Sequence, residues 1–480
     1  FVATLVKNML LFDLGMCIAI PGIIIPALTG ITNEFNRNEY LSLTPSQVSW
    51  LGSVNYVVEP LGSVLSAIIT DALGRKRTMM LVNIPLIIAW FMMYNATSVT
   101  EIFVADVLLG LGVGLMESPI ITYIGEICSP SLRGVLLAYS NIAGTLGMFF
   151  VLILNTLMPW RIVGLVCMFV PIGTIVALCF VPETPMWLLS KNRTAEAEKS
   201  LCWLRGWVPK EKIAKEFEAM QHYSDRTKFC NSCIKQNLKC THPPPTKIEK
   251  LKELKRKHTM KPFFIVMSLF FIAQFSGILA MTPFIVQIFK AYESPIAPDR
   301  TAAIQSFVNN IANISFLCLV KFTGKRKLYL TMLTGVFLCA AIVAGYGFLV
   351  LPSGYNSFDQ SQHFSLENQS LAYIPFIAIF VWSFCSYCGV NSLAWQLLSE
   401  VFPYKTRGAA TGLTAALNYV LCFISTKIYY NLEMMFSLPG VALFNCIIIA
   451  GGLILMYKIL PETENRSLED IEMHFVDNSK

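Results

Sequence analysis

Glu126-Ile-Cys-Ser-Pro-Ser-Leu-Arg133-Gly134 has a counterpart much later in the chain, Glu400-Val-Phe-Pro-Tyr-Lys-Thr-Arg407-Gly408. In each copy a glutamate follows a long apolar run, an arginine stands seven positions after it, and a glycine opens the next apolar run. Internal sequence symmetry of this kind is typical of membrane proteins built from two related halves. The stretch therefore predicts a duplicated molecule.

Two further pairs of motifs keep the same order. Gly74-Arg75-Lys76-Arg77 is matched by Gly324-Lys325-Arg326-Lys327, and Pro182-Glu183-Thr184 by Pro461-Glu462-Thr463. The three offsets are similar, 250 (74 to 324), 274 (126 to 400) and 279 (182 to 461) residues. One half of the protein thus resembles a copy of the other.

The composition indicates a membrane protein. Of the 480 residues, 55% are hydrophobic and 14% are charged, and the mean hydropathy is +0.57. A soluble protein carries about 25% charged residues. The apolar residues form recurring runs of about 20, long enough to cross the hydrocarbon core as helices. We predict an all-α polytopic membrane protein with twelve spans: near 4–28, 46–70, 79–97, 101–124, 135–157, 161–181, 263–290, 300–321, 328–351, 371–398, 409–430 and 437–460.

The placement of the basic residues predicts the orientation. Most loop cations fall on one side of the predicted membrane: Arg75, Lys76, Arg77, Arg133, Lys325, Arg326, Lys327, Lys405 and Arg407. By the positive-inside rule this side is cytosolic, and an even number of spans puts both termini there. The net charge of +7 does not indicate nucleic-acid binding, because the cations flank membrane helices instead of forming one patch.

We predict four segments from this pattern. They are an N-terminal six-helix bundle (1–189), a cytosolic linker (190–261), a C-terminal six-helix bundle (262–460) and a cytosolic tail (461–480). Within the linker, Thr194–Leu204 and Glu211–His222 have the apolar spacing of short amphipathic helices. A third, basic helix is expected over Ile248–His258, after the break at Pro243-Pro244-Pro245.

The order of the motifs resembles one family over essentially the whole chain. The chain is similar to sugar porters of the major facilitator superfamily, nearest in style to the insect facilitated trehalose transporters. Besides the duplicated stretch, the most specific segments are Pro182-Glu-Thr-Pro-Met-Trp-Leu188 and Pro461-Glu-Thr-Glu-Asn-Arg-Ser-Leu-Glu469. The resemblance implies the major facilitator fold, with two pseudo-symmetric six-helix halves, and alternating-access transport at the plasma membrane.

The resemblance also implies a cytosolic latch, a set of charges that closes the cytosolic face when the cavity opens outward. Its expected members are Asp71, Arg75, Glu126, Arg133, Glu183, Glu400, Arg407 and Glu462. Glu–Arg pairs at helix ends can form and break without covalent change. The alternative is that the basic residues only set the topology. The chain departs from the family pattern at Ala72, Asp106 and Met186, and at Lys321, where the second-half loop lacks the expected acidic residue.

Amides and a tryptophan within the spans are the candidate sugar ligands. A sugar offers hydroxyls and apolar ring faces, which suit uncharged donor–acceptor side chains and an aromatic platform. The resemblance points to Gln274, Asn309, Trp395, Asn418 and Asn141. An intramembrane amide can equally join neighbouring helices by hydrogen bonds. Two ligands expected from the family are absent, because Ala273 and Leu279 stand in their places.

Acids and cysteines supply further hypotheses. Asp13 and Asp106 lie inside apolar spans, where an acid indicates function, and proton coupling is one such function. Cys230, Cys233 and Cys240 with His242 resemble half of a zinc site, and free thiols are the simpler interpretation. No metal or other cofactor is expected. Asn368 and Asn95 open sequons on the predicted outer side and are expected glycosylation sites. Cys385 and Cys388 are expected to pack within the tenth span.

We predict a facilitative, alternating-access carrier of a trehalose- or hexose-class sugar that works as a monomer. The alternatives are a proton-coupled sugar symporter and a transporter-like sensor or scaffold that has lost transport. An enzyme is not indicated, because the sequence has neither a Walker loop nor a recognisable nucleophile–base set.

Overall fold

The computed structural model describes residues 2–31, 34–36, 39–127, 130–227, 257–358, 366, 368–402 and 407–464. It leaves undescribed the side chains of 34, 130–138, 223–227, 257–258, 399 and 407–409. Throughout these ranges the regular structure is helical, and none of the described residues forms a strand. This confirms the predicted all-α class.

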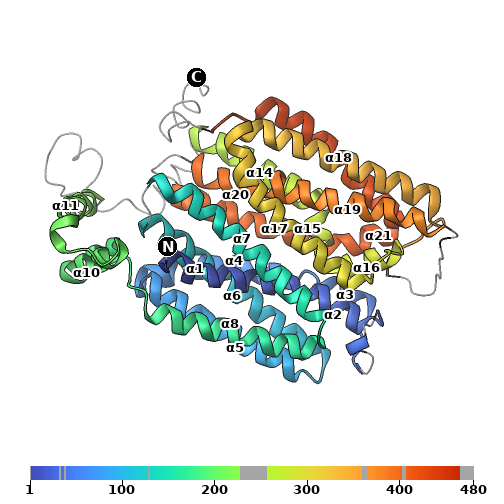
Figure 1. Ribbon diagram of the computed structural model, residues 1–480, viewed down its shortest axis with the longest axis horizontal. Helices are drawn as coiled ribbons and strands as arrows, with labels where there is room; N and C mark the ends of the chain where they lie inside the picture. The colour runs from blue at the N-terminus through green and yellow to red at the C-terminus, as the bar shows by residue number, and fades with distance from the viewer. Residues whose placement is uncertain are drawn as a thin grey trace.

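The helices fall into two bundles that lie side by side along the long axis of the molecule (Figure 1). The first bundle contains α1 (Val2–Ala19), α2 (Pro21–Leu28), α3 (Pro45–Leu51), α4 (Val54–Leu73), α5 (Arg75–Asn95), α6 (Val99–Ile127), α7 (Pro130–Asn155) and α8 (Trp160–Cys179). The second contains α14 (Lys257–Phe275), α15 (Ile278–Met281), η2 (Thr282–Phe284), α16 (Ile285–Ala291), α17 (Pro298–Thr323), α18 (Lys325–Val350), η3 (Gln369–Ala372), α19 (Tyr373–Cys385), η4 (Ser386–Val390), α20 (Asn391–Glu400) and α21 (Arg407–Ile459).

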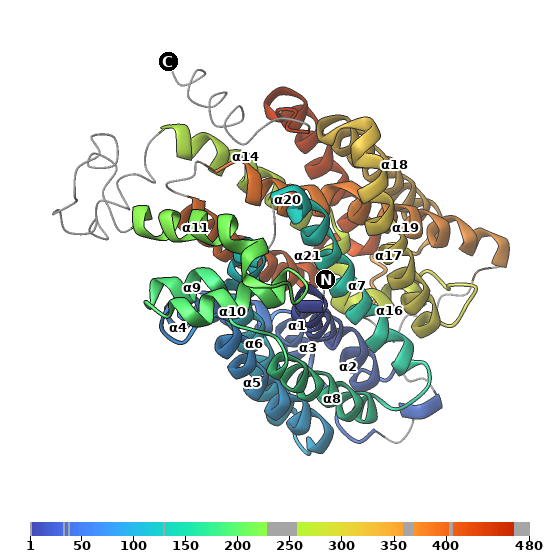
Figure 2. The same cartoon turned by 60° about the vertical axis from the view of Figure 1, so that its left-hand side comes forward.

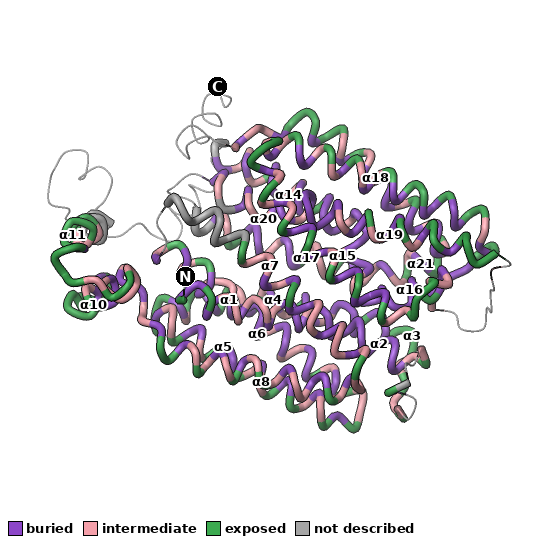
Figure 3. The backbone as a smooth tube through the Cα atoms, in the orientation of Figure 1, coloured by how far each residue is buried: buried purple, intermediate pink, exposed green. Residues whose placement is uncertain are grey.

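Nine described helical segments are long and apolar enough to cross a membrane. One of them, Ala410–Ile459, is 50 residues long and is interrupted at Ser437, where φ is +68°. The pair 259–275 and 278–291, bent by 45°, forms a broken span, and Tyr139–Asn155 is a shorter apolar helix. If Ala410–Ile459 is counted as two spans, these elements are compatible with the predicted twelve, which stays a prediction. Large apolar side chains such as Leu61, Phe91 and Ile447 are exposed, as expected for contact with lipid. Exposed positions recur along the outer helices of both bundles (Figure 3).

The break between α14 and α15 has a local cause. Gly277 has a φ of +106°, which only glycine adopts without strain, and a side chain there would collide with Trp382 and Asn445. The carbonyl of Ser276, freed from the helix, accepts a hydrogen bond of 3.0 Å from the Trp382 indole. Broken membrane helices need such replacement partners.

Each bundle has a basic end, which we define by the loops Gly74–Arg77 and Gly324–Lys327; the opposite end is called the far end. Beside the first bundle's basic end lie α9 (Pro185–Ser190), α10 (Thr194–Leu204) and α11 (Lys210–Thr227), which come forward in Figure 2. α10 coincides with its predicted helix, and α11 extends the predicted Glu211–His222 at both ends. The predicted helix over Ile248–His258 falls almost wholly outside the described residues.

The two bundles meet through α7 and α17 and through α4 and α21. Midway along α7, the Thr145 hydroxyl donates to the Asn310 amide oxygen at 2.9 Å, and Asn310 returns a bond of 3.2 Å to the Thr145 carbonyl. Asn313 donates to the same hydroxyl at 3.2 Å. These side chains are buried, so the bonds join the halves away from water.

The halves also meet at the far end. Ser49 donates to the Lys427 carbonyl at 3.1 Å, and the Lys427 ammonium lies 3.9 Å from the centre of the Trp50 ring. Gly22 approaches η2 so closely that a Cβ would stand 3.2 Å from the Thr282 carbonyl oxygen. The far end is therefore packed shut between α2, α3, η2 and α21.

Candidate functional site

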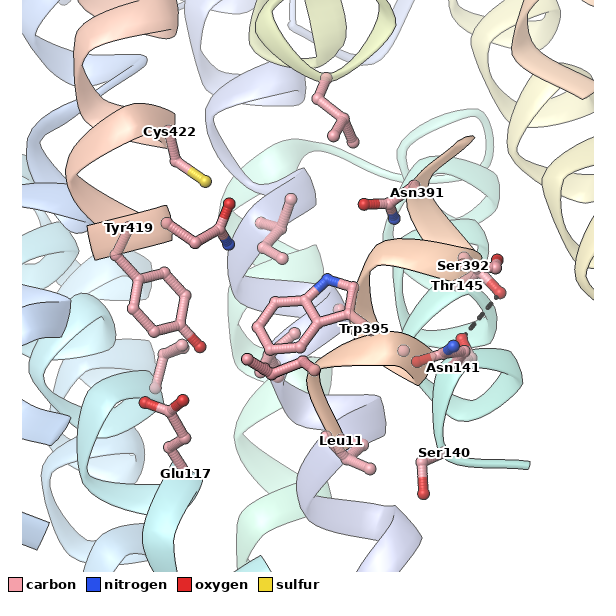
Figure 4. Close-up of a pocket in the computed structure, with 18 of the residues that line it drawn as sticks. Leu11, Glu117, Ser140, Asn141, Thr145, Asn391, Ser392, Trp395, Tyr419 and Cys422 are labelled. Atoms are coloured by element: carbon pink, nitrogen blue, oxygen red, sulfur yellow. Dashed lines mark hydrogen bonds between the residues drawn. The ribbon is translucent and has the colours of Figure 1, made fainter. Parts of the chain in front are cut away.

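A cavity of about 330 Å³ lies between the two bundles. Side chains of α1, α4, α6 and α7 line it from the first bundle, and side chains of α14, α15, η2, α17, η4, α20 and α21 from the second. The lining extends toward the basic end as far as Ser140 and Glu400, and Figure 4 shows part of it. A space of this size suits a small-molecule ligand.

Four of the five predicted ligand residues line this cavity. Gln274 and Asn418 are hydrogen-bonded to each other at 3.1 Å, Gln274 on α14 donating to Asn418 on α21. Asn141 lies on α7, and Trp395 on α20 packs edge-on against Phe270 with 5.1 Å between ring centres. Figure 4 shows the Trp395 indole extending into the space between the helices. The structure brings these residues together, and their binding role stays a prediction.

Asn309 does not line the cavity. Its amide oxygen accepts a hydrogen bond of 2.6 Å from Ser383, which in turn accepts one of 3.0 Å from Gln305. All three side chains are buried between α17 and α19. This is the helix-joining arrangement that the sequence left open as the alternative.

Several cavity residues were missed by sequence reasoning. The most notable are Glu59 on α4 and Glu117 on α6, with Tyr56 and Tyr419 beside them in the lining. The signal was present, because both glutamates lie within predicted spans, as Asp13 and Asp106 do. At one of the expected ligand positions, Leu279 lines the cavity with an apolar side chain.

A charged cluster lies at the basic end of the first bundle; we call Arg75, Glu126, Glu183 and Thr184 the first cluster. Arg75 donates through two nitrogens to Glu126 Oε1, at 2.8 and 3.1 Å, while the Thr184 hydroxyl donates to Oε2. Glu183 accepts bonds of 3.0 to 3.2 Å from the backbone N–H groups of Arg75 and Lys76. A carboxylate there stabilises the N-terminus of α5.

The second bundle carries an equivalent arrangement; we call Lys325, Glu400, Glu462 and Glu464 the second cluster. The Lys325 ammonium lies 2.7 Å from Glu400 and 3.2 Å from Glu464. Glu462 accepts bonds of 3.0 and 3.1 Å from the backbone N–H groups of Lys325 and Arg326, and so caps α18. The duplicated glutamates thus occupy the same place in both halves.

The other predicted latch residues are less informative. Asp71 is 83% exposed and lies 3.7 Å from Arg75, which makes a weak surface pair. The side chains of Arg133 and Arg407 fall outside the described residues. Each described ion pair of the two clusters joins residues of the same half. The latch therefore stays a prediction.

The two acids singled out from the sequence are buried in the first bundle. Asp13 accepts a bond of 3.4 Å from the Trp90 indole, and its second oxygen has no described partner. Neither carboxylate oxygen of Asp106 has a hydrogen-bond partner among the described residues. Neither acid lines the cavity.

At the far end, Glu39 joins the first bundle's loops. It accepts bonds from Arg161 at 3.0 and 3.1 Å and from the Trp160 indole at 2.9 Å. Partial burial opposes ionisation of Glu39, but these bonds outweigh it and hold the pKa of Glu39 below its usual range. Asn95 and Asn368, the predicted glycosylation sites, are exposed.

All ten cysteines that the structure describes are free, and Cys385 and Cys388 are buried as expected. The predicted zinc ligands Cys230, Cys233, Cys240 and His242 lie outside the described residues. Within the described part, no group of three or more potential metal ligands is found.

Comparison with known proteins gives consistent matches along the chain. A family model described as "Sugar (and other) transporter" matches residues 2–475. The facilitated trehalose transporter Tret1 of Apis mellifera ligustica is 26% identical over 453 residues, covering 94% of this chain and 83% of the relative. Tret1 of Bombyx mori is 26% identical over 444 residues, covering 92% and 82%.

Among solved structures, the major facilitator proton:xylose symporter XylE bound to 6-bromo-6-deoxy-D-glucose superposes with a TM-score of 0.72 at 17% identity, covering 99% of this chain and 98% of the other. XylE from E. coli in an inward open conformation also gives 0.72 at 17% identity, with 98% of each chain covered. At this identity the likeness concerns the fold, which is the predicted major facilitator fold.

Proposed function

Since this chain belongs to the sugar (and other) transporter family and moves a sugar across a membrane, we propose that it does so as a facilitative carrier by alternating access. The substrate belongs to the trehalose or hexose class, and the carrier works as a monomer in the plasma membrane. Its basic end faces the cytosol, as the positive-inside rule predicts. The sequons at Asn95 and Asn368 then face outward and accept glycans.

One observation supports this proposal above the others. The cavity between the halves is packed shut at the far end by the contacts of Trp50 with Lys427 and of Gly22 with η2. Its lining reaches toward the basic end, to Ser140 and Glu400. A carrier that exposes its site to one side at a time requires such a closed end and such a central site. We assign this structure to an inward-facing state.

Within the cavity, Gln274, Asn418 and Asn141 are proposed to bind sugar hydroxyls, and Trp395 to pack against the ring. Asn309 is proposed to act indirectly, by holding α17 against α19 through Ser383. The apolar Leu279 and Ala273 at the two altered positions remove ligands that the family pattern leads us to expect. The site is therefore built for a substrate that differs from a simple hexose in part of its hydrogen-bonding pattern.

Uptake by proteoliposomes tests the proposal. We expect labelled trehalose or glucose to enter down its gradient without a proton gradient, and empty liposomes serve as the blank. Gln274→Ala should weaken apparent affinity about fivefold to tenfold, because a ligand hydrogen bond is lost. Gln287→Ala is the matched control, since Gln287 is also a buried glutamine but lies outside the cavity lining. Absence of flux with every sugar would favour the sensor or scaffold alternative.

Proton-coupled symport is the second candidate, because Asp13 and Asp106 are fully buried acids with unpaired oxygens among the described residues. Uptake that requires an inward proton gradient, and that becomes gradient-independent in Asp13→Asn, would establish it in place of facilitated diffusion.

The proposed latch is tested separately. Arg133→Ala and Arg407→Ala should slow transport while leaving the amount of protein at the cell surface unchanged. Wild-type uptake in both variants would leave the basic residues with a topological role only.

A further inference from the structure

Two glutamates in the cavity have carboxylate oxygens that nothing in the described structure satisfies. Glu59 is 1% exposed, and its Oε2 is buried without a hydrogen-bond partner among the described residues. Neither oxygen of Glu117 has a hydrogen bond of normal geometry among the described residues, and its polar neighbour is the Ser63 hydroxyl. Figure 4 shows the Glu117 carboxylate turned toward the Tyr419 hydroxyl side of the cavity. Buried polar atoms without partners are costly, so their retention indicates a ligand.

No described residue of the cavity lining supplies a counter-charge. The lining includes Glu59, Glu117 and Glu400, but none of its described members is Lys, Arg or His. Glu400 is paired with Lys325, which leaves Glu59 and Glu117 as two uncompensated acids. They lie on the adjoining helices α4 and α6, close enough to repel each other when both are ionised. A positive charge placed between them would relieve this repulsion.

The walls around the two acids also suit a cation. Tyr56 and Tyr419 line the cavity with Glu59 and Glu117, and each is only 9% exposed. Aromatic faces attract a desolvated ammonium group, and carboxylates form short charge-assisted hydrogen bonds to it. The same cavity holds Trp395 and the amides Gln274 and Asn418, which suit a ring that carries hydroxyls.

We propose that the preferred substrate is a sugar that carries a protonated amine. Glu59 and Glu117 bind the ammonium group between Tyr56 and Tyr419, while the amides and Trp395 bind the sugar ring. This inference rests on the proposed sugar transport, because it specifies the substrate class of the same cavity. The ammonium group would also supply a counter-charge to Glu59 and Glu117, which a neutral sugar would leave buried without one.

The test compares three sugars in proteoliposomes at mildly acidic pH: glucose, glucosamine and N-acetylglucosamine. Glucosamine carries the ammonium group, while the other two are neutral and bracket it in size. We expect glucosamine to compete for labelled glucose uptake about tenfold more strongly than N-acetylglucosamine does. Glu59→Gln and Glu117→Gln should abolish this difference between the sugars. Glu101→Gln, at a partly exposed glutamate outside the cavity, should preserve it.

The outcomes separate the two proposals. If glucose is taken up and glucosamine competes no better than N-acetylglucosamine, the amine inference is overturned and the acids are protonated packing residues, while sugar transport stands. If no sugar is taken up at all, both proposals fail. The competition in the wild-type protein decides the inference by itself, so a variant that fails to fold does not leave it open.

Discussion

The first and second clusters occupy equivalent places in the two halves, but they are not built alike. Each cluster contains a glutamate that follows the last helix of its bundle and caps another helix. Glu183 accepts hydrogen bonds from the first two backbone N–H groups of α5, and Glu462 from the first two of α18. The ion pairs differ. Arg75 serves one acid, Glu126, whereas Lys325 lies between Glu400 and Glu464.

The shared part is set by backbone geometry. Gly74 and Gly324 have φ values of +97° and +78°, and a Cβ at either would stand 2.4 or 2.8 Å from the capping carboxylate. The side chains of the ion pairs are under no such restriction. The comparison therefore teaches that duplication preserved the turn and its cap, while the charges around them diverged.

The largest difference in stability between equivalent variants of the two halves is expected when the cation of each cluster, Lys325 or Arg75, is replaced by alanine. Lys325→Ala leaves Glu400 and Glu464 facing each other without a counter-charge, and we expect a loss of about 3 kcal/mol in stability. Arg75→Ala should cost less, because Glu126 keeps the bond from Thr184. Thermal unfolding in detergent, with uptake measured alongside, checks the order. An Arg75→Ala variant that is the less stable of the two would contradict it.

Removing the caps should affect both halves equally. Glu183→Ala and Glu462→Ala each withdraw the acceptor of two backbone N–H groups, and we expect a loss of about 2 kcal/mol in either case. The measurement is the shift in unfolding midpoint of each variant. A loss confined to one half would show that the caps are not equivalent.

The two threonines give a sharper contrast. The Thr184 hydroxyl donates to Glu126, whereas the Thr463 hydroxyl is buried with no hydrogen-bond partner among the described residues. Thr184→Val should therefore cost about 1.5 kcal/mol, and Thr463→Val close to nothing, because valine has nearly the same shape. Equal losses would mean that packing, not the hydrogen bond, accounts for the threonine.

The smallest effect is expected from exchanging the type of cation. Arg75→Lys keeps the charge but replaces two N–H donors to Glu126 by a single ammonium, at a cost of about 1 kcal/mol. The variant gives the first cluster a lysine paired with one glutamate, whereas Lys325 in the second cluster is paired with two, Glu400 and Glu464.

A second variant, Glu464→Gln, removes one of these two glutamates from the second cluster. We expect it to change the free energy of unfolding by no more than about 0.5 kcal/mol. A large change in either variant would refute this ranking.

The sequence predicted the fold well, because runs of about 20 apolar residues and paired loop motifs are local signals. It could not predict which charges pair. Glu126 and Arg133 are seven positions apart, yet the described charged partner of Glu126 is Arg75, 51 residues away. Such contacts depend on how helices are placed in three dimensions.

The site shows a related difficulty within single helices. Hydropathy places Asn309 and Asn310 in the same span, but successive helical residues face directions about 100° apart. Asn309 consequently bonds Ser383 of its own half, and Asn310 bonds Thr145 of the other. Glu59 and Glu117 could have been singled out as acids within apolar spans, as Asp13 and Asp106 were, but the apolar run does not show which of these four acids faces the cavity.

The bonds among Thr145, Asn310 and Asn313 have a mechanical consequence. When one rigid body rocks against another, points on the rotation axis hardly move, and displacement grows with distance from it. The hydrogen bonds midway along α7 and α17 join positions at which such a rotation would move the two halves least. Trp50 and Lys427 lie at the far end, where the displacement would be larger. If the halves rock as proposed, these threonine and asparagine side chains lie near the rotation axis, and we expect a covalent cross-link there to permit transport that a cross-link between Trp50 and Lys427 would stop.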